Sequence, residues 1–145
     1  MDRRSQVERV GILEGLPLFA RLTTRQLKAV AKVSSDVRYE PGKVILKELD
    51  SGQNLVVIAS GTAKVVHGGR VLATVGPGDV IGEMAIIDGE PRSATVTADS
   101  AVEGIMIYRT AFLRLLDEHP TMCWRLLLAQ TARLRELDKQ AVLPA

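Results

Sequence analysis

The 145-residue sequence predicts a mainly β fold, a sandwich or barrel of seven or eight short strands with helices at both ends. Both ends show apolar residues at helical spacing, whereas the middle consists of short β-branched runs separated by turn residues. These runs follow one another without the intervening helices that a parallel sheet requires. The length suits one domain, so we expect residues 1–145 to form a single unit that is helical at 5–35, β at 36–109 and helical at 110–140.

Two helices are expected in the N-terminal part. Ser5 can cap a first segment whose apolar residues recur at helical spacing. Thr23 or Thr24 can cap a second segment that contains Leu27 and Val30. Between the two segments, GLPLF is typical of a tight connector.

Turn residues divide the middle of the chain into the expected strands, which include VRYE, KVILKEL, NLVVIAS, TAKVVH and RVLATV. The sequence GPGD at 76–79 then turns the chain. A short helix is expected at 82–88, because GEMAIID contains good helix formers and is followed by Gly89 and Pro91.

The C-terminal part predicts two helices. AFLRLLDEHP forms a short one that stops at Pro120, and TMCWRLLLAQTARLRELDKQ forms a longer one with basic residues toward its end.

Composition excludes several classes of function. The net charge of +2 is mixed along the chain, so no basic stripe indicates nucleic acid. No apolar run approaches the roughly 20 residues that span a bilayer, and MDRRSQVERV lacks the apolar segment of a signal peptide. We therefore expect a cytoplasmic protein that binds neither nucleic acid nor, by itself, a membrane.

An enzymatic role is not expected, and we predict neither catalytic residues, nor a metal, nor a cofactor. Cys123 is the only cysteine, which excludes a disulfide framework and a cysteine-pair zinc site. A metal-binding barrel needs a cluster of histidines, but only His67 and His119 are present and they lie in different parts of the chain. No serine or cysteine has an evident partner base.

The segment IGEMAIIDGEPRSATV, residues 81–96, contains charged residues, notably Glu83 and Arg92, among glycines, small residues and aliphatics. Gly82 opens a short helix and lets the backbone approach a ligand, while the first helical amides have no partners within the helix and favour an anion. Arg92 is expected between an apolar β-layer and a helix, where a guanidinium without an anion would be unfavourable. Either Glu83 supplies that anion through a salt bridge, or a ligand phosphate supplies it and Glu83 can accept a hydrogen bond from a sugar hydroxyl.

This segment, G82-E83-M84-A85 followed by P91-R92-S93-A94-T95-V96, closely resembles the phosphate-binding cassette of the cyclic-nucleotide-binding domain family. That family includes the catabolite activator protein, cyclic-nucleotide-dependent protein kinases and cyclic-nucleotide-gated channels. Outside the cassette, GLPLFARLTTRQLKAVA resembles the family's entry helix and YEPGKVILKELDSGQNLVVIASGTAKV its first strands. The resemblance implies an eight-stranded antiparallel β-roll, a jelly-roll-like double-stranded β-helix.

The resemblance also implies roles for individual residues. Arg92 would bind the cyclic phosphate together with Ser93 and the amide of Ala85. Glu83 would accept a hydrogen bond from the ribose 2′-hydroxyl, and Gly82 would give close backbone contact. Serine at position 93 favours cyclic AMP as the ligand, although its hydroxyl could still reach the guanine of cyclic GMP.

Further contacts are implied for the rest of the nucleotide. Met84 and Ala94 are part of the cassette, and Val65 would supply an apolar wall for the base. Arg133 on the last helix could stack on the base or could be a solvated helix residue. The alternatives on the same helix are Leu134 and Leu137.

Two positions depart from the family pattern. Ile81 stands where an aromatic residue is frequent, and so do Leu55 and Val56 after the DSGQ turn. Both changes keep apolar packing, so we expect retained binding.

The sequence therefore predicts a small cyclic-nucleotide sensor, with cyclic AMP as the preferred ligand and a last helix that moves on binding. Alternatives are a ligand-free β-roll interaction domain, or the excised regulatory domain of a larger channel, enzyme or transcription factor. We expect no DNA-binding module, because the sequence ends at LPA soon after the last helix. An unidentified protein effector or self-association is possible, but packing onto the roll is the expected use of Met122, Leu126, Ala129 and Leu137.

Overall fold

The computed structural model describes residues 4–141. Its N-terminal part contains helix α1 (Gln6–Glu14), a 3₁₀ turn η1 (Pro17–Phe19) and helix α2 (Thr24–Lys32). Both predicted helices begin with a capping box, in which the Ser5 or Thr23 hydroxyl accepts from the third helical amide and the Glu8 or Gln26 side chain accepts from the cap amide. The structure therefore confirms Ser5 as one cap and selects Thr23 as the other.

Eight antiparallel strands form two four-stranded sheets, in the orders β1-β8-β3-β6 and β2-β7-β4-β5. The strand bounds are β1 Ser35–Tyr39, β2 Val44–Leu46, β3 Asn54–Ser60, β4 Ala63–His67, β5 Arg70–Val75, β6 Val80–Ile81, β7 Thr95–Ala98 and β8 Val102–Tyr108. The first strand pairs with the eighth, the second with the seventh, the third with the sixth and the fourth with the fifth. This nested pairing is that of a folded double-stranded hairpin, so the predicted β-roll is confirmed.

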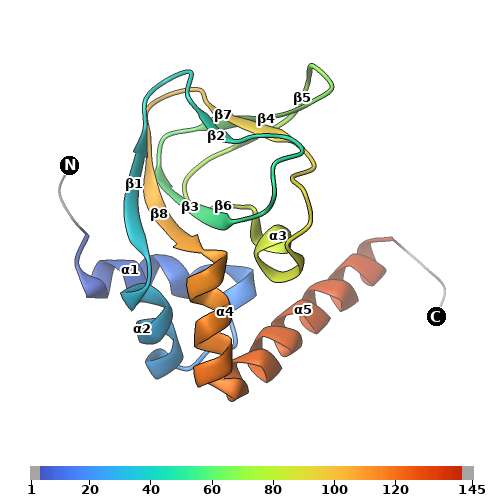
Figure 1. Cartoon of the computed structure of the whole chain (residues 1–145). Helices are drawn as coiled ribbons and strands as arrows, with labels where there is room; N and C mark the ends of the chain where they lie inside the picture. Colours follow the sequence, from blue (N-terminus) through green and yellow to red (C-terminus); the bar gives the residue numbers. More distant parts are fainter. Residues whose placement is uncertain (1–3, 142–145) are drawn as a thin grey trace.

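Three further helices follow among the described residues. Helix α3 (Glu83–Asp88) lies between β6 and β7, and helices α4 (Arg109–Glu118) and α5 (Pro120–Gln140) follow β8. Pro120 is the first residue of α5, a position where its missing amide hydrogen has no effect on the helix. Figure 1 shows the roll above α1, α2 and α4, with α3 at the lower edge of the roll and α5 extending outward past α3.

Apolar side chains form two cores, one on each face of the sheet that contains β3. Val56 and Ile58 point into the roll, whereas Leu55 and Val57 pack against the helical layer. Burial on both faces explains why NLVVIAS is a continuous apolar run. The structure confirms that the departures from the family pattern keep their packing, because Leu55, Val56 and Ile81 are all buried.

Two boundaries between the helical and β parts differ by one residue from the expected ranges. Ser35 was expected in the helical part but begins β1, because it pairs with Met106 of β8. Arg109 was expected in the β part but begins α4, where its amide donates to the carbonyl of Gln53 at 2.7 Å.

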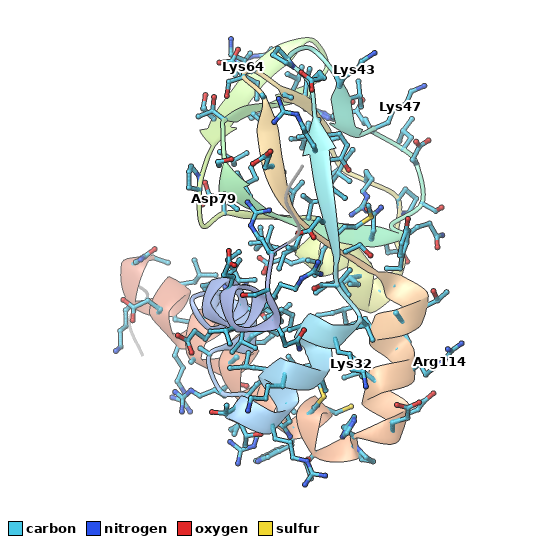
Figure 2. All side chains as sticks on the ribbon, turned by 90° about the vertical axis from the view of Figure 1, so that its left-hand side faces the viewer. Lys32, Lys43, Lys47, Lys64, Asp79 and Arg114 are labelled. Carbon is cyan, nitrogen blue, oxygen red and sulfur yellow. The ribbon has the colours of Figure 1, made fainter. Side chains whose placement is uncertain are left out.

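Cationic side chains are spread over both layers. Figure 2 shows Lys43 and Lys47 pointing outward from the roll and Arg114 pointing outward from α4, and all three are exposed. Within residues 4–141, no helix combines the length and the apolar character needed to cross a membrane.

Candidate functional site

The chain enters α3 through Gly82, whose backbone has a positive φ of 86°. Glycine adopts this conformation without strain, whereas other L-residues rarely do. A Cβ at this position would also overlap the Arg92 guanidinium and would lie 2.9 Å from the carbonyl oxygen of Asn54. Both the conformation and the close approach therefore require glycine here.

The Arg92 side chain is held in the wall of the roll by neutral acceptors. Only 7% of the residue is exposed. Its Nη2 donates to the side-chain oxygen of Asn54 at 3.0 Å and to the Asn54 carbonyl, and its Nη1 donates to the Gly82 carbonyl over a long 3.4 Å. Burial lowers the pKa of the Arg92 guanidinium.

No carboxylate within residues 4–141 forms a salt bridge with Arg92. Its positive charge is thus oriented but not compensated, and the salt bridge to Glu83 that the sequence left open does not form. Removing a charge from water is unfavourable unless an opposite charge replaces the water, so this arrangement favours an incoming anion.

The backbone of the Arg92 segment is fixed by the loop that precedes β3. The amide of Arg92 donates to the Asp50 carbonyl at 2.8 Å, and the amide of Leu49 donates to the Arg92 carbonyl at 2.9 Å. His67 also contacts this segment, because its Nδ1 lies 3.1 Å from the Ser93 carbonyl oxygen and beside the Glu48 carboxylate. These contacts fix the position of the guanidinium relative to α3.

Glu83 has two carboxylate oxygens in different environments. Oε1 accepts a 2.8 Å hydrogen bond from Nη1 of Arg133 on α5. Oε2 is buried and accepts no hydrogen bond from the described residues. The first hydrogen bond within α3 runs from the amide of Ile86 to the carbonyl of Gly82 at 3.2 Å. The amides of Glu83 to Ala85 come before it and therefore have no partners within the helix.

These groups surround a cavity of about 580 Å³ between the roll, α3 and α5. Its volume lies in the range of about 300–1,000 Å³ that is usual for small-molecule sites. This cavity is lined by all nine residues that the sequence predicted for the site, although they come from β4, the residue before α3, α3 itself, the segment after α3, and α5. They are Val65, Gly82, Glu83, Met84, Ala85, Arg92, Ser93, Ala94 and Arg133.

Two polar residues at the site, Asn54 and Gln130, were not among those predicted from the sequence. Asn54, which orients Arg92, is the polar first residue of an apolar strand, and its role follows only from the fold. Gln130 lines the cavity from α5, one helical turn before Arg133 and Leu134. Its helical spacing from these residues is a signal that could have identified it.

The arrangement can hold a ligand that is anionic at one end and carries a hydroxyl donor at the other. Arg92 can bind the anion, and the open oxygen of Glu83 can accept a hydrogen bond from the hydroxyl. The roll contributes an apolar wall that includes Val65, and α5 contributes the alternatives named above, Leu134 and Leu137. No three His, Cys, Asp or Glu side chains between residues 4 and 141 are placed to hold a metal ion.

Comparisons with known proteins agree with this geometry. A family model described as "Cyclic nucleotide-binding domain" matches residues 36–119. The chain is 34% identical over 116 residues to a cGMP-dependent protein kinase of Toxoplasma gondii, covering 80% of this chain and 12% of the kinase. It is 33% identical over 131 residues to the cyclic AMP receptor protein of Thermus thermophilus, covering 87% of this chain and 61% of that protein. It thus spans less than two thirds of each of these relatives.

A solved structure extends the similarity to nearly the whole chain. The crystal structure of the N-terminal domain of a transcriptional regulator from Streptomyces coelicolor A3(2) superimposes with a TM-score of 0.79 at 31% identity. The match covers 91% of this chain and 96% of that domain.

Proposed function

The chain belongs to the cyclic nucleotide-binding domain family, whose members are regulatory rather than catalytic domains, and we propose that it binds cyclic AMP in the cavity between the roll and α5. One observation carries the proposal: Arg92 is buried beside the cavity with no opposite charge among the described residues. A cyclic phosphodiester carries a single negative charge, so it would supply the counter-ion that the Arg92 guanidinium does not have among the described residues.

Each part of the nucleotide has a proposed partner. Arg92, the Ser93 hydroxyl and the amide of Ala85 would bind the phosphate, and Oε2 of Glu83 would accept from the ribose 2′-hydroxyl. Gly82 lets the backbone approach the ligand. The remaining cavity residues, which include Met84, Ala94, Val65 and residues of α5, would surround the sugar and the base.

The preference for cyclic AMP over cyclic GMP is supported by Ser93, because the family resemblance associates threonine at this position with cyclic GMP. Ser93 is exposed and lines the cavity, so a larger hydroxyl residue fits there without disturbing the core. A Ser93→Thr variant is expected to shift the preference toward cyclic GMP. An unchanged ratio of the two affinities would contradict this role.

The proposed output is a change in α5. This helix forms one wall of the cavity, and a ligand shifts its position to the extent that it binds one position better than another. The partner that reads this change would be an effector protein, a second copy of the chain, or the rest of a larger protein. Hydrogen exchange in residues 130–140 should slow when cyclic AMP is bound, and equal exchange with and without ligand would contradict this part of the proposal.

Ligand-dependent melting tests the binding proposal directly. At 100 times the dissociation constant, cyclic AMP should add about 2.7 kcal/mol of stability, which is a shift of several degrees for a domain of this size. Arg92→Ala should abolish the shift, whereas Arg114→Ala, which removes an exposed arginine on α4, should preserve it. Because Arg92 has no ionic partner among residues 4–141 that would be left unpaired, its variant is expected to fold. The absence of a shift with either cyclic nucleotide would instead favour an interaction domain that has lost its ligand.

A further inference from the structure

The ion pair between Arg133 and Glu83 joins two elements that are 50 residues apart in sequence. Arg133 lies on α5 with 43% of its side chain exposed, whereas only 19% of the Glu83 side chain is exposed. Ion pairs between fully exposed side chains contribute little, because water and salt screen them. This carboxylate is largely removed from water, so the pair is screened less and holds Glu83 in one orientation.

That orientation leaves one oxygen of Glu83 open toward a ligand. Arg133 occupies Oε1, while Oε2 is buried and accepts no hydrogen bond from residues 4–141. A buried carboxylate oxygen without a donor is unfavourable, and here a ligand in the cavity can supply the donor. A sugar hydroxyl is such a donor, and Glu83 itself lines the cavity.

The same ion pair attaches the second half of α5 to the rest of the protein. The buried side chains of α5 are Met122, Leu126 and Ala129, and residues 131–140 are all exposed. Beyond Ala129, the Arg133–Glu83 pair is the one polar contact between described residues that joins α5 to another element. A ligand that engages Glu83 therefore also acts on the attachment of this helix.

We propose that Arg133 is a positioning residue for sugar recognition: by holding one oxygen of Glu83, it presents the other to the 2′-hydroxyl of the bound nucleotide. This inference rests on the proposed function, since it concerns the same ligand. It assigns Arg133 a role different from stacking on the base, because the guanidinium is directed to the carboxylate of α3. It also makes α5 part of the ribose site, so that binding of the sugar and the position of the helix depend on the same ion pair.

The two roles for Arg133 predict different losses of affinity. Removal of a base-stacking residue weakens every ligand with the same base by a similar factor. Removal of a residue that positions Glu83 weakens only those ligands that carry the 2′-hydroxyl. Cyclic AMP and 2′-deoxy cyclic AMP share the base and the phosphate and differ in this one group, so their affinity ratio separates the two roles.

The experiment measures both dissociation constants by titration calorimetry, with the melting temperature of each unliganded variant as a folding control. The wild-type chain should prefer cyclic AMP over its 2′-deoxy form by roughly 10- to 100-fold, the range for a hydrogen bond to a charged group. Arg133→Gln should reduce this ratio to a few-fold and leave the 2′-deoxy affinity nearly unchanged. Arg133→Lys keeps the charge and should restore part of the ratio.

The matched control is Arg135→Gln, which removes the same charge from an exposed position two residues away on α5 and should keep the wild-type ratio. A wild-type ratio in Arg133→Gln, or an equal loss for both ligands, would overturn the inference while leaving cyclic-nucleotide binding intact. A wild-type chain that binds cyclic AMP without preferring it over the 2′-deoxy form would overturn it as well. Failure of the wild-type chain to bind either ligand would instead refute the proposed function.

Discussion

Asn54→Asp is the substitution that most directly tests whether the uncompensated charge of Arg92 attracts the ligand. The side-chain oxygen of Asn54 lies 3.0 Å from Nη2 of Arg92, so aspartate, which has nearly the same shape, would place a carboxylate oxygen there. The guanidinium would then have an internal counter-ion before any ligand arrives. We expect the variant to fold, because a buried cation gains a partner.

The expected loss of affinity follows from the charges. At an effective dielectric constant of about 20, opposite charges 3 Å apart attract by roughly 5.5 kcal/mol, which stabilises the unliganded state. A phosphate on the open side of the guanidinium would lie about 6 Å from the new carboxylate and be repelled by roughly 2.8 kcal/mol. That repulsion corresponds to about 100-fold weaker binding.

Titration calorimetry with cyclic AMP measures the effect, and Gln53→Glu is the matched control. It makes the same charge change one residue earlier, but the Gln53 side chain is exposed and bonds to Ser51 instead of Arg92. The control should bind within a few-fold of the wild-type chain. If Asn54→Asp binds cyclic AMP as tightly as Gln53→Glu does, the uncompensated guanidinium is not what attracts the ligand, and the reasoning fails.

Three further predictions concern backbone geometry, titration and capping. Gly82→Ala should lower the free energy of unfolding by about 1–3 kcal/mol or more, measured by denaturant unfolding, and should weaken cyclic AMP binding, measured by calorimetry. Gly78→Ala is the control, because Gly78 has a similar φ of 88° but open space around it, and it should affect stability alone. Burial raises the pKa of Tyr39, and the charge of Tyr108 raises it further, so the contribution of Tyr39 to stability is complete below the unfolded pKa near 10 and is lost as pH rises through the folded pKa. Tyr39→Phe should flatten this alkaline decline in melting temperature, and Tyr108→Phe, which removes only the smaller cause, should flatten it less. Thr23→Ala should lower the free energy of unfolding by about 1 kcal/mol, and an unchanged midpoint in urea would contradict its role as a cap.

The local features of the fold could be predicted from the sequence because they depend on neighbouring residues. Caps at Ser5 and Thr23, the turns, and the change from helical to strand periodicity all follow from short-range physics. The nested pairing of the strands does not, since partners such as Ser35 and Met106 are far apart in sequence. Only the resemblance to a known family supplied that arrangement.

The site shows the same division. Gly82, Glu83 and Arg92 could be singled out because a glycine before a short helix and two opposite charges lie among small and apolar residues, whereas the roles expected of them came from the family resemblance. The ion pair of Arg133 with Glu83 could not be predicted from the sequence, because it depends on the direction of α5 across the molecule. Buried contacts earlier in the helix set that direction. The role of Asn54 was likewise hidden, since its direction toward Arg92 is fixed only when β3 and the segment after α3 are brought together.

Arg109 connects the loop before β3 and the end of α3 to the start of α4, and it does not itself line the cavity. Its amide donates to Gln53 before β3, and its guanidinium donates to the carbonyls of Ile86 and Ile87 at the end of α3. None of the described residues of α4 lines the cavity, yet α3 cannot withdraw from the start of α4 without losing both side-chain bonds. The junction of β8 and α4 therefore ties a six-residue helix at the site to the start of the segment that leads into a twenty-one-residue one, so neither can be displaced relative to the other without breaking these bonds.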